Sequence, residues 1–233
     1  MRAELRKLWT VRANWLLLAI AQLVVAAGVS GLMMRRDDQL AAVAHIGLVA
    51  LFSLLLGIVA IAGEYRHRTI TDAFLAEPRR SRVVLAKLVV SAGAGAFFGL
   101  VATVTALVTD VAWLAGKGEP IELGSGDLWR TVAGGIVWNI VFAAVGVGVG
   151  ALITNLGAAV AVSLAWLALV EGIVAQLIGD AGRWLPFALG GALVGLPPNA
   201  DRPGPWVAGL ALAGYAAVLV GAGLATTVRR DVT

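Results

Sequence analysis

Cysteine is absent from this chain of 233 residues, and histidine occurs only twice, at His45 and His67. The lack of cysteine excludes disulfides, thiolate metal sites and cysteine nucleophiles. Two histidines are too few for a histidine-rich metal site, so we predict no metal site in this chain. The Walker A pattern of ATP-binding proteins and the His-Glu-x-x-His and Gly-x-Ser-x-Gly patterns of hydrolases are also missing. These absences argue against an enzyme and against ATP binding by that route.

Charged residues are also scarce. They make up 14% of the chain, whereas 60% of the residues are hydrophobic and the mean hydropathy is +0.89. This balance is far from that of a soluble domain and predicts an all-α integral membrane protein. The net charge is +4, and the basic residues cluster beside apolar runs, where they set orientation and meet anionic headgroups. We therefore expect membrane lipids as partners of these charges, and no nucleic acid.

Six apolar runs are long enough to cross a membrane as helices, which takes about 20 residues. They cover residues 14–33, 40–63, 83–111, 128–153, 156–178 and 205–228. The first run follows a basic leader but exceeds the apolar core of a signal peptide, so we interpret it as an uncleaved span. In residues 1–13, Leu5, Leu8 and Trp9 lie opposite four basic residues, which predicts an interfacial amphipathic helix. Residues 1–233 then form a single transmembrane domain.

The distribution of basic residues predicts the orientation. Lysine and arginine concentrate in the cytoplasmic segments of membrane proteins. Six spans put both termini on one side, and twelve of the 18 basic residues fall on that side. We therefore expect a multi-pass protein of the cell membrane with both termini in the cytoplasm.

The longest polar stretch, residues 64–82, lies between the second and third spans on the predicted cytoplasmic side. Thr69 and Asp72 have the spacing of a capping box, and Pro78 would end the helix after about two turns. Apolar residues form one stripe along this helix: Ile70, Ala73 and Phe74. Arginines bracket it: Arg66, Arg68, Arg79, Arg80 and Arg82. We predict a short amphipathic helix that docks against a partner.

Residues 180–204, between the fifth and sixth spans, do not fit a simple hairpin. Their apolar part covers about ten residues after Trp184, too few to cross a hydrocarbon core of ~30 Å. This length predicts a re-entrant or interfacial segment on the outer side. Such a segment needs protein around it to satisfy its backbone groups.

Two acidic residues lie inside predicted spans. Glu171 is near the middle of the fifth span, where an acid costs about 2.5 to 3.5 kcal/mol on insertion. It either lines a translocation path, with Asn139 and Gln176 as further candidates, or pairs with one of these amides or a backbone group and fixes the rotation of its helix. Asp110 lies toward the outer end of the third span, and we expect it to reach the interface.

Glycines recur four residues apart in three pairs: Gly95 and Gly99, Gly146 and Gly150, and Gly191 and Gly195. Such spacing lets helix backbones approach closely in lipid. The contact is either ordinary packing within the chain or a dimer or gating interface.

The polar stretch resembles the segment after the second span of ABC-2 type permeases. The resemblance rests on Gly63-Glu64, the basic residues that follow, Thr69-Ile70, Pro78, Ser81-Arg82 and Lys87. Arg68 stands where the family pattern often has glycine. The arrangement of six spans with an N-terminal interfacial helix, a cytoplasmic element and an outer re-entrant segment agrees with the same family.

The resemblance implies the membrane subunit of a type V ABC exporter. Such a subunit pairs with a second copy, or a similar permease, and with separate ABC ATP-binding subunits that hold ATP and Mg²⁺, so this chain needs no cofactor of its own. The polar stretch would be the coupling helix, with Phe74 and Leu75 as apolar contacts. Arg68, Arg79 and Arg82 would meet acidic residues of the ATPase. Glu64 would lie at the membrane edge, where a salt bridge would fix the helix.

The mostly apolar spans favour a hydrophobic or amphipathic cargo such as an antibiotic, a lipid or a peptide, and the family implies export. A haem-exporter-like permease stays open within the same class. From other classes, a membrane scaffold or sensor would use residues 64–82 to bind a cytoplasmic protein without transport. A membrane-embedded transferase would need clustered carboxylates or histidines, and the acids here are scattered.

Overall fold

The computed structural model describes residues 2–35, 38–77, 79–120, 122–196 and 201–229, and these residues form helices and connectors without a strand. Six helical segments among these residues are long and apolar enough to cross a membrane, as the prediction of an all-α, multi-pass membrane protein requires. They are Arg12–Met33 (α2), Gln39–Arg66 (α3, η1 and α4), Arg80–Lys117 (α6), Gly126–Leu152 (α7), Leu156–Leu177 (α8, η2 and α9) and Pro205–Thr227, within α11 (Pro205–Arg229).

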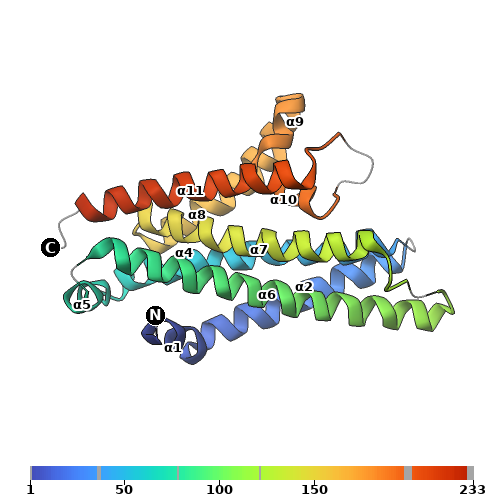
Figure 1. The fold of residues 1–233 in the computed structure, drawn as a ribbon, viewed down its shortest axis with the longest axis horizontal. Helices are drawn as coiled ribbons and strands as arrows, with labels where there is room; N and C mark the ends of the chain where they lie inside the picture. Colours follow the sequence, from blue (N-terminus) through green and yellow to red (C-terminus); the bar gives the residue numbers. More distant parts are fainter. Residues whose placement is uncertain (1, 36–37, 78, 121, 197–200, 230–233) are drawn as a thin grey trace.

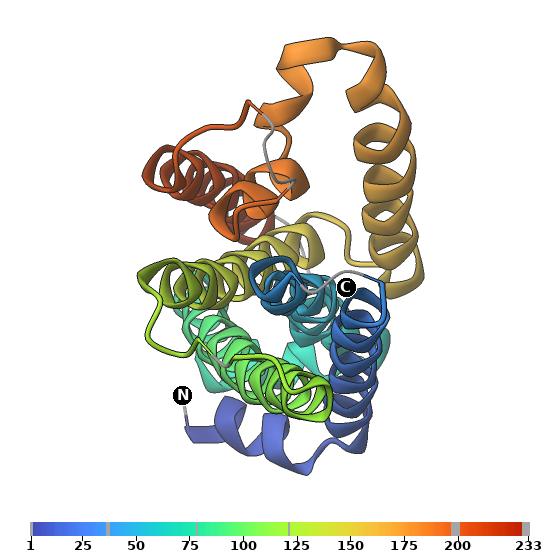
Figure 2. The same ribbon diagram turned by 90° about the vertical axis from the view of Figure 1, so that its right-hand side faces the viewer.

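Shorter helices lie at the two ends of this bundle (Figure 1). At one end, α1 (Arg2–Thr10) and α5 (Ile70–Ala76) lie near the chain start and the C-terminal end of α11. Figures 1 and 2 show α1 lying across the long axis of the bundle. At the other end, η3 (Gly179–Trp184) and α10 (Pro186–Leu193) fill most of the predicted 180–204 segment, and α10 packs against α11 and α7.

The central helix is α7, which packs against α4 (Ala50–Arg66), α6 and α11. Close approach at the α4 contact depends on glycine. A Cβ atom at Gly146 would lie 2.1 Å from the carbonyl oxygen of Leu54, and one at Gly57 would lie 2.2 Å from that of Ala143. The glycines at 95 and 99 pack in the same way against α7. These pairs therefore serve packing within the chain.

The third pair of glycines behaves differently. Gly195 has φ +81° in the turn after α10, so it supplies a left-handed backbone conformation and not a helix contact. The prediction of helix packing for this pair was wrong, because α10 ends at Leu193.

Two predicted spans differ in their boundaries. Helix α6 runs from Arg80 to Lys117, longer than the predicted 83–111. Asp110, within this helix, is fully buried, and its carboxylate accepts a hydrogen bond of 2.8 Å from the Gln39 side chain. The expectation that Asp110 lies at the level of the membrane interface stays a prediction. The second span begins with α3 (Gln39–Val43) and a 3₁₀ segment, η1 (Ala44–Val49).

The fifth span is interrupted by a π-helix. Helix α8 (Leu156–Ala165) leads into η2 (Trp166–Val174) and the short α9 (Ala175–Leu177). Few side chains of this span are buried. Figure 2 shows the later part of this span set apart from the bundle, while α8 contacts α4 and α7 and the other end returns through η3 and α10. The longest interruption of α-helical geometry in the described spans thus contains Glu171.

Candidate functional site

The predicted short helix between the second and third spans is α5, in the middle of the polar stretch. Its first residue, Ile70, is buried and anchors the helix to the bundle. Phe74 is half-buried, with the guanidinium of Arg80 5.2 Å from the centre of its ring. Leu75 points away, with 77% of its surface exposed. Of the two expected apolar contacts, only Leu75 is presented openly.

The turn before α5 is a Schellman motif. The Arg68 amide donates to the Tyr65 carbonyl at 3.2 Å, and the Thr69 amide donates to the Glu64 carbonyl at 3.0 Å. This pattern needs a left-handed residue, usually glycine, and Arg68 occupies it with φ +56°. A residue with a Cβ at this position therefore carries backbone strain.

The same motif explains why the predicted capping box is wrong. Thr69 closes the end of α4, and its φ of −86° and ψ of −8° are right-handed helical values. An N-cap residue normally has extended backbone angles. The Thr69 side chain accordingly makes no capping hydrogen bond, and Asp72 is exposed. The role predicted for Pro78 lies outside the described residues.

Replacing Arg68 by glycine is expected to stabilise the protein by about 1 kcal/mol, because a left-handed conformation costs about 1–2 kcal/mol in residues with a Cβ. Thermal unfolding in detergent measures the effect. The control is Arg66→Gly, at the end of α4, which should lower stability by a similar amount because Arg66 is helical. A loss of stability in Arg68→Gly would show that the arginine side chain holds the turn.

A cluster of four charged residues lies beside α5: Glu4 and Lys7 from α1, Glu64 from α4 and Lys87 from α6. We call it the charged cluster. The Lys87 ammonium lies 2.9 Å from Glu4 Oε2 and 2.7 Å from Glu64 Oε1, and its side chain is only 1% exposed. Lys7 lies 2.5 Å from Glu64 Oε1 and 3.3 Å from Glu4 Oε1. Two acids and two lysines thus tie α1 to two spans.

The charges of this cluster shift the pKa values of the α1 residues. Burial acts to raise the pKa of Glu4, but the hydrogen bond and charge of Lys87, helped by Lys7, outweigh it and lower that pKa. Burial acts to lower the pKa of Lys7, but the hydrogen bond and charge of Glu64, with Glu4, raise it instead. Both residues of α1 are therefore held in their charged forms.

A hollow of about 670 Å³ opens between α1, α5 and the start of α6. Its rim carries Glu4, Lys7 and Asp72, and also Glu77 and Arg82, which form an ion pair of 3.7 Å. Both partners of that pair are largely exposed, so it contributes little to stability. Arg79 is exposed, and no group of three or more acids and histidines among the described residues is arranged to hold a metal ion.

The second candidate region surrounds Glu171 in η2. Trp166 Nε1 donates to Glu171 Oε1 at 3.2 Å, and the amides of Phe187 and Ala188 donate to Glu171 Oε2 at 2.7 and 3.1 Å. These amides belong to the first turn of α10, whose N-cap residue, Leu185, offers no side-chain acceptor. Glu171 therefore caps a helix from another part of the chain. Residues five apart lie on the same face of a π-helix, so this geometry brings the Trp166 and Glu171 side chains together.

The three residues proposed for a translocation path do not come together. Asn139 is fully buried in α7, where its amide accepts from Ser53 and donates to the backbone carbonyls of Ile46 and Gly135. Gln176 is exposed and donates to the carbonyl of Gly172. The alternative expectation was that Glu171 pairs with Asn139, with Gln176 or with a backbone group. The structure shows the backbone pairing, with the amides of Phe187 and Ala188. An apolar cavity of about 360 Å³ lies beside Glu171, between the fifth span, α4, α7 and α11.

Sequence reasoning missed the two α1 members of the charged cluster. Glu4 is the one acid in a basic amphipathic segment, and it stands three residues before Lys7. A lone acid among basic residues signals an ion pair, but the spacing pointed only to a local one. The salt bridge expected for Glu64 is present, and both of its partners are lysines.

No protein-family model matches this chain, and a search of curated proteins finds no significant match.

Proposed function

We propose that this chain is the membrane subunit of an ATP-driven ABC-2 type exporter in the cell membrane, with both termini in the cytoplasm. One observation carries the proposal: a short helix with an exposed leucine, α5, lies between two span-length helices, at the end of the bundle that holds α1 and the C-terminal end of α11. The resemblance of residues 63–87 to the family motif covers the same segment.

In this proposal α5 is the coupling helix that inserts into a cleft of a separate ABC ATP-binding subunit. Leu75 makes the apolar contact, while Phe74 supports the helix from behind under Arg80. Arg79 and Arg82 face acidic residues of the ATPase, which binds ATP and Mg²⁺. Closure of the ATPases then displaces α5, and the charged cluster transmits the displacement to α1, α4 and α6, shifting the population of two arrangements of the spans.

The cargo in this proposal is hydrophobic or amphipathic. The cavity beside Glu171 supports this, because apolar side chains from four spans dominate its lining. The carboxylate of Glu171 lies at the cavity and already accepts three hydrogen bonds, so it does not offer a free charge to a small ion. A second copy of the chain would complete the path, α1 would lie in the cytoplasmic interface, and η3 with α10 would form the outer re-entrant segment.

Replacing Leu75 by aspartate is expected to weaken binding of the ATP-binding subunit at least tenfold, because burying a leucine contributes about 1.5 to 3 kcal/mol. Co-purification of the chain with the ABC ATP-binding subunits of its source, reconstituted in lipid nanodiscs, measures binding and ATPase activity. The matched control is Leu123→Asp, an exposed leucine between α6 and α7. It should bind like the wild type.

Two results would contradict the proposal. Binding that is lost equally in both variants would place the contact elsewhere. A partner that binds through α5 without any ATP-dependent change would favour the membrane scaffold or sensor. Stimulation of the ATPase by amphiphiles, compared with haem and with hydrophilic solutes, then tests the class of cargo.

A further inference from the structure

A second apolar hollow, of about 360 Å³, runs between α1, the start of α2 and α6. We call it the α1 groove. Its lining consists of Leu5, Leu8, Trp9, Asn14, Trp15, Leu18, Leu56, Val89, Val90, Gly93, Ala94, Phe97 and Phe98. Asn14 is the single polar residue of this lining, and its amide already donates to the carbonyl of Leu8. The groove therefore offers almost nothing to a polar ligand.

The charged cluster attaches α1, one wall of this groove, to α4 and α6. Lys87 and Lys7 hold one side of α1 against α4 and α6 through Glu64 and Glu4, so α1 is fixed above the surface of α6. On α6 the floor of the groove includes Gly93, where a Cβ atom would meet nothing within 4 Å. The missing side chain at this position thus leaves a space that the surrounding residues do not fill.

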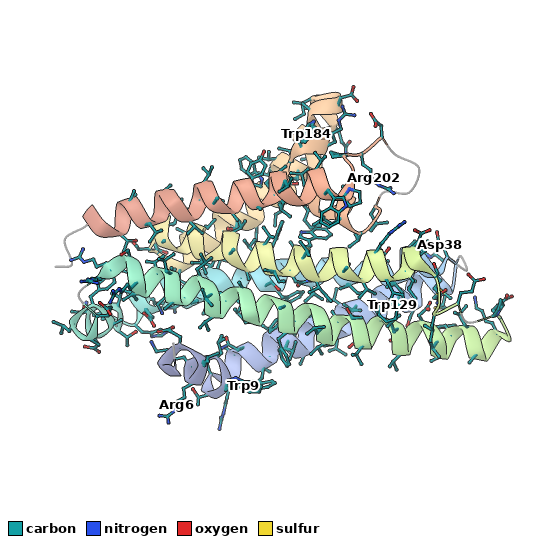
Figure 3. The ribbon with its side chains drawn as sticks, viewed as in Figure 1. Arg6, Trp9, Asp38, Trp129, Trp184 and Arg202 are labelled. Atoms are coloured by element: carbon teal, nitrogen blue, oxygen red, sulfur yellow. The ribbon has the colours of Figure 1, made fainter. Side chains whose placement is uncertain are left out.

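Aromatic side chains form the rim. Trp9 is 60% exposed, Trp15 is 42% exposed and Phe97 is 39% exposed. Trp9, labelled on α1 in Figure 3, packs its ring against those of Trp15 and Phe97, with centroid distances of 5.3 and 6.1 Å. Tryptophans gather at the level of lipid headgroups in membrane proteins. Water in such a groove would lack hydrogen-bond partners, whereas a hydrocarbon chain would fill it without cost to polar groups.

Two arginines lie next to the rim. Arg6 follows Leu5 on α1, and Arg12 precedes Trp15 by one turn on α2. Both are exposed, and no ion pair joins either of them to another described side chain. Figure 3 shows Arg6 on the outer side of α1. Guanidinium groups bind phosphate oxygens through paired hydrogen bonds, so these positions suit an anionic headgroup.

We propose that the α1 groove binds one anionic phospholipid, with an acyl chain in the groove and the phosphate between Arg6 and Arg12. The site is independent of the exporter function, because it needs neither an ATPase nor a cargo. The bound lipid would contact both α1 and α6, and so would add to the ion pairs of the charged cluster that hold α1 against the spans.

The test compares two glycine variants that differ only in place. Gly93→Phe fills the groove, and Gly214→Phe adds the same ring to α11 at a position that is also exposed and open. Native mass spectrometry of protein exchanged into equal amounts of phosphatidylglycerol and phosphatidylcholine measures the retained lipid. We expect wild type and Gly214→Phe to retain one phosphatidylglycerol, and Gly93→Phe to lose it at least tenfold.

The headgroup half of the site is tested without touching the groove. Arg6→Gln and Arg12→Gln alter exposed side chains, and each should weaken the preference for phosphatidylglycerol about fivefold, as expected for one basic residue near an anionic lipid. An unchanged preference in both variants would overturn the headgroup assignment.

The acyl-chain half is overturned if Gly93→Phe retains lipid like the wild type. It is also overturned if Gly93→Phe and Gly214→Phe lose lipid equally. If Gly93→Phe keeps its lipid but no longer self-associates, the groove is occupied by a second copy and not by lipid.

Discussion

Replacing Lys87 by methionine is expected to lower the free energy of unfolding by about 3 to 5 kcal/mol, the range for breaking a buried ion pair by removing one partner. Lys87 is 1% exposed and is the cation between Glu4 and Glu64. Without it, two carboxylates share the single ammonium of Lys7. Chemical or thermal unfolding of the purified chain in detergent measures the loss.

The control for this prediction is Arg79→Met, which removes an exposed cation at the same end of the bundle and should change stability by less than about 0.5 kcal/mol. Adding Glu64→Gln to Lys87→Met should restore part of the loss, because the two residues interact directly. Equal losses for Lys87→Met and Arg79→Met would mean that the charged cluster does not hold the helices together.

Replacing Gly146 by alanine is expected to destabilise the chain by about 3 kcal/mol, the upper part of the usual range for overpacking. The added Cβ would lie 2.1 Å from the carbonyl oxygen of Leu54 and 3.0 Å from the Cα of Gly57. Both obstacles are backbone atoms of α4, so no side-chain rotation relieves the clash. The two helices must separate along their contact, and unfolding measurements in detergent report the cost.

Gly214→Ala is the matched substitution, because a Cβ at Gly214 in α11 meets nothing within 4 Å. It should be neutral or stabilise by up to about 1 kcal/mol, since alanine favours a helix over glycine. If Gly146→Ala were as stable as Gly214→Ala, the close approach of α4 and α7 would not limit the packing of the bundle.

The six spans could be predicted because their signal is local: each is a continuous apolar run of sufficient length. The first and last residues of the spans were harder to predict from the sequence. Helix α6 continues through Trp113 and Leu114 to Lys117, where hydropathy falls although the helix does not end. The left-handed Gly118 stops it, and glycine in such a glycine-rich chain is a weak stop signal.

Only the parts of the candidate site that depend on residues close together in the sequence could be predicted. The position of α5 could be predicted from its apolar stripe. The predicted N-cap at Thr69 was wrong, because the Thr69 amide instead donates to the Glu64 carbonyl and ends α4. The partners of Glu64 stand 57 and 23 positions away, at Lys7 and Lys87, and no periodicity links such distant positions. The same holds for Glu171, whose hydrogen bonds to the first turn of α10 arise from tertiary structure.

The length of α6 has a consequence for how the molecule meets membranes of different thickness. Its 38 residues correspond to roughly 57 Å along the axis, and even a tilt of 40° leaves roughly 44 Å across a hydrocarbon core of ~30 Å. The helix therefore exceeds the hydrocarbon core by roughly 14 Å even at that tilt, which is enough for both ends to reach the headgroup layers when the helix is centred in the bilayer. A soluble protein approaching α5, next to one end, would reach it without entering the hydrocarbon core.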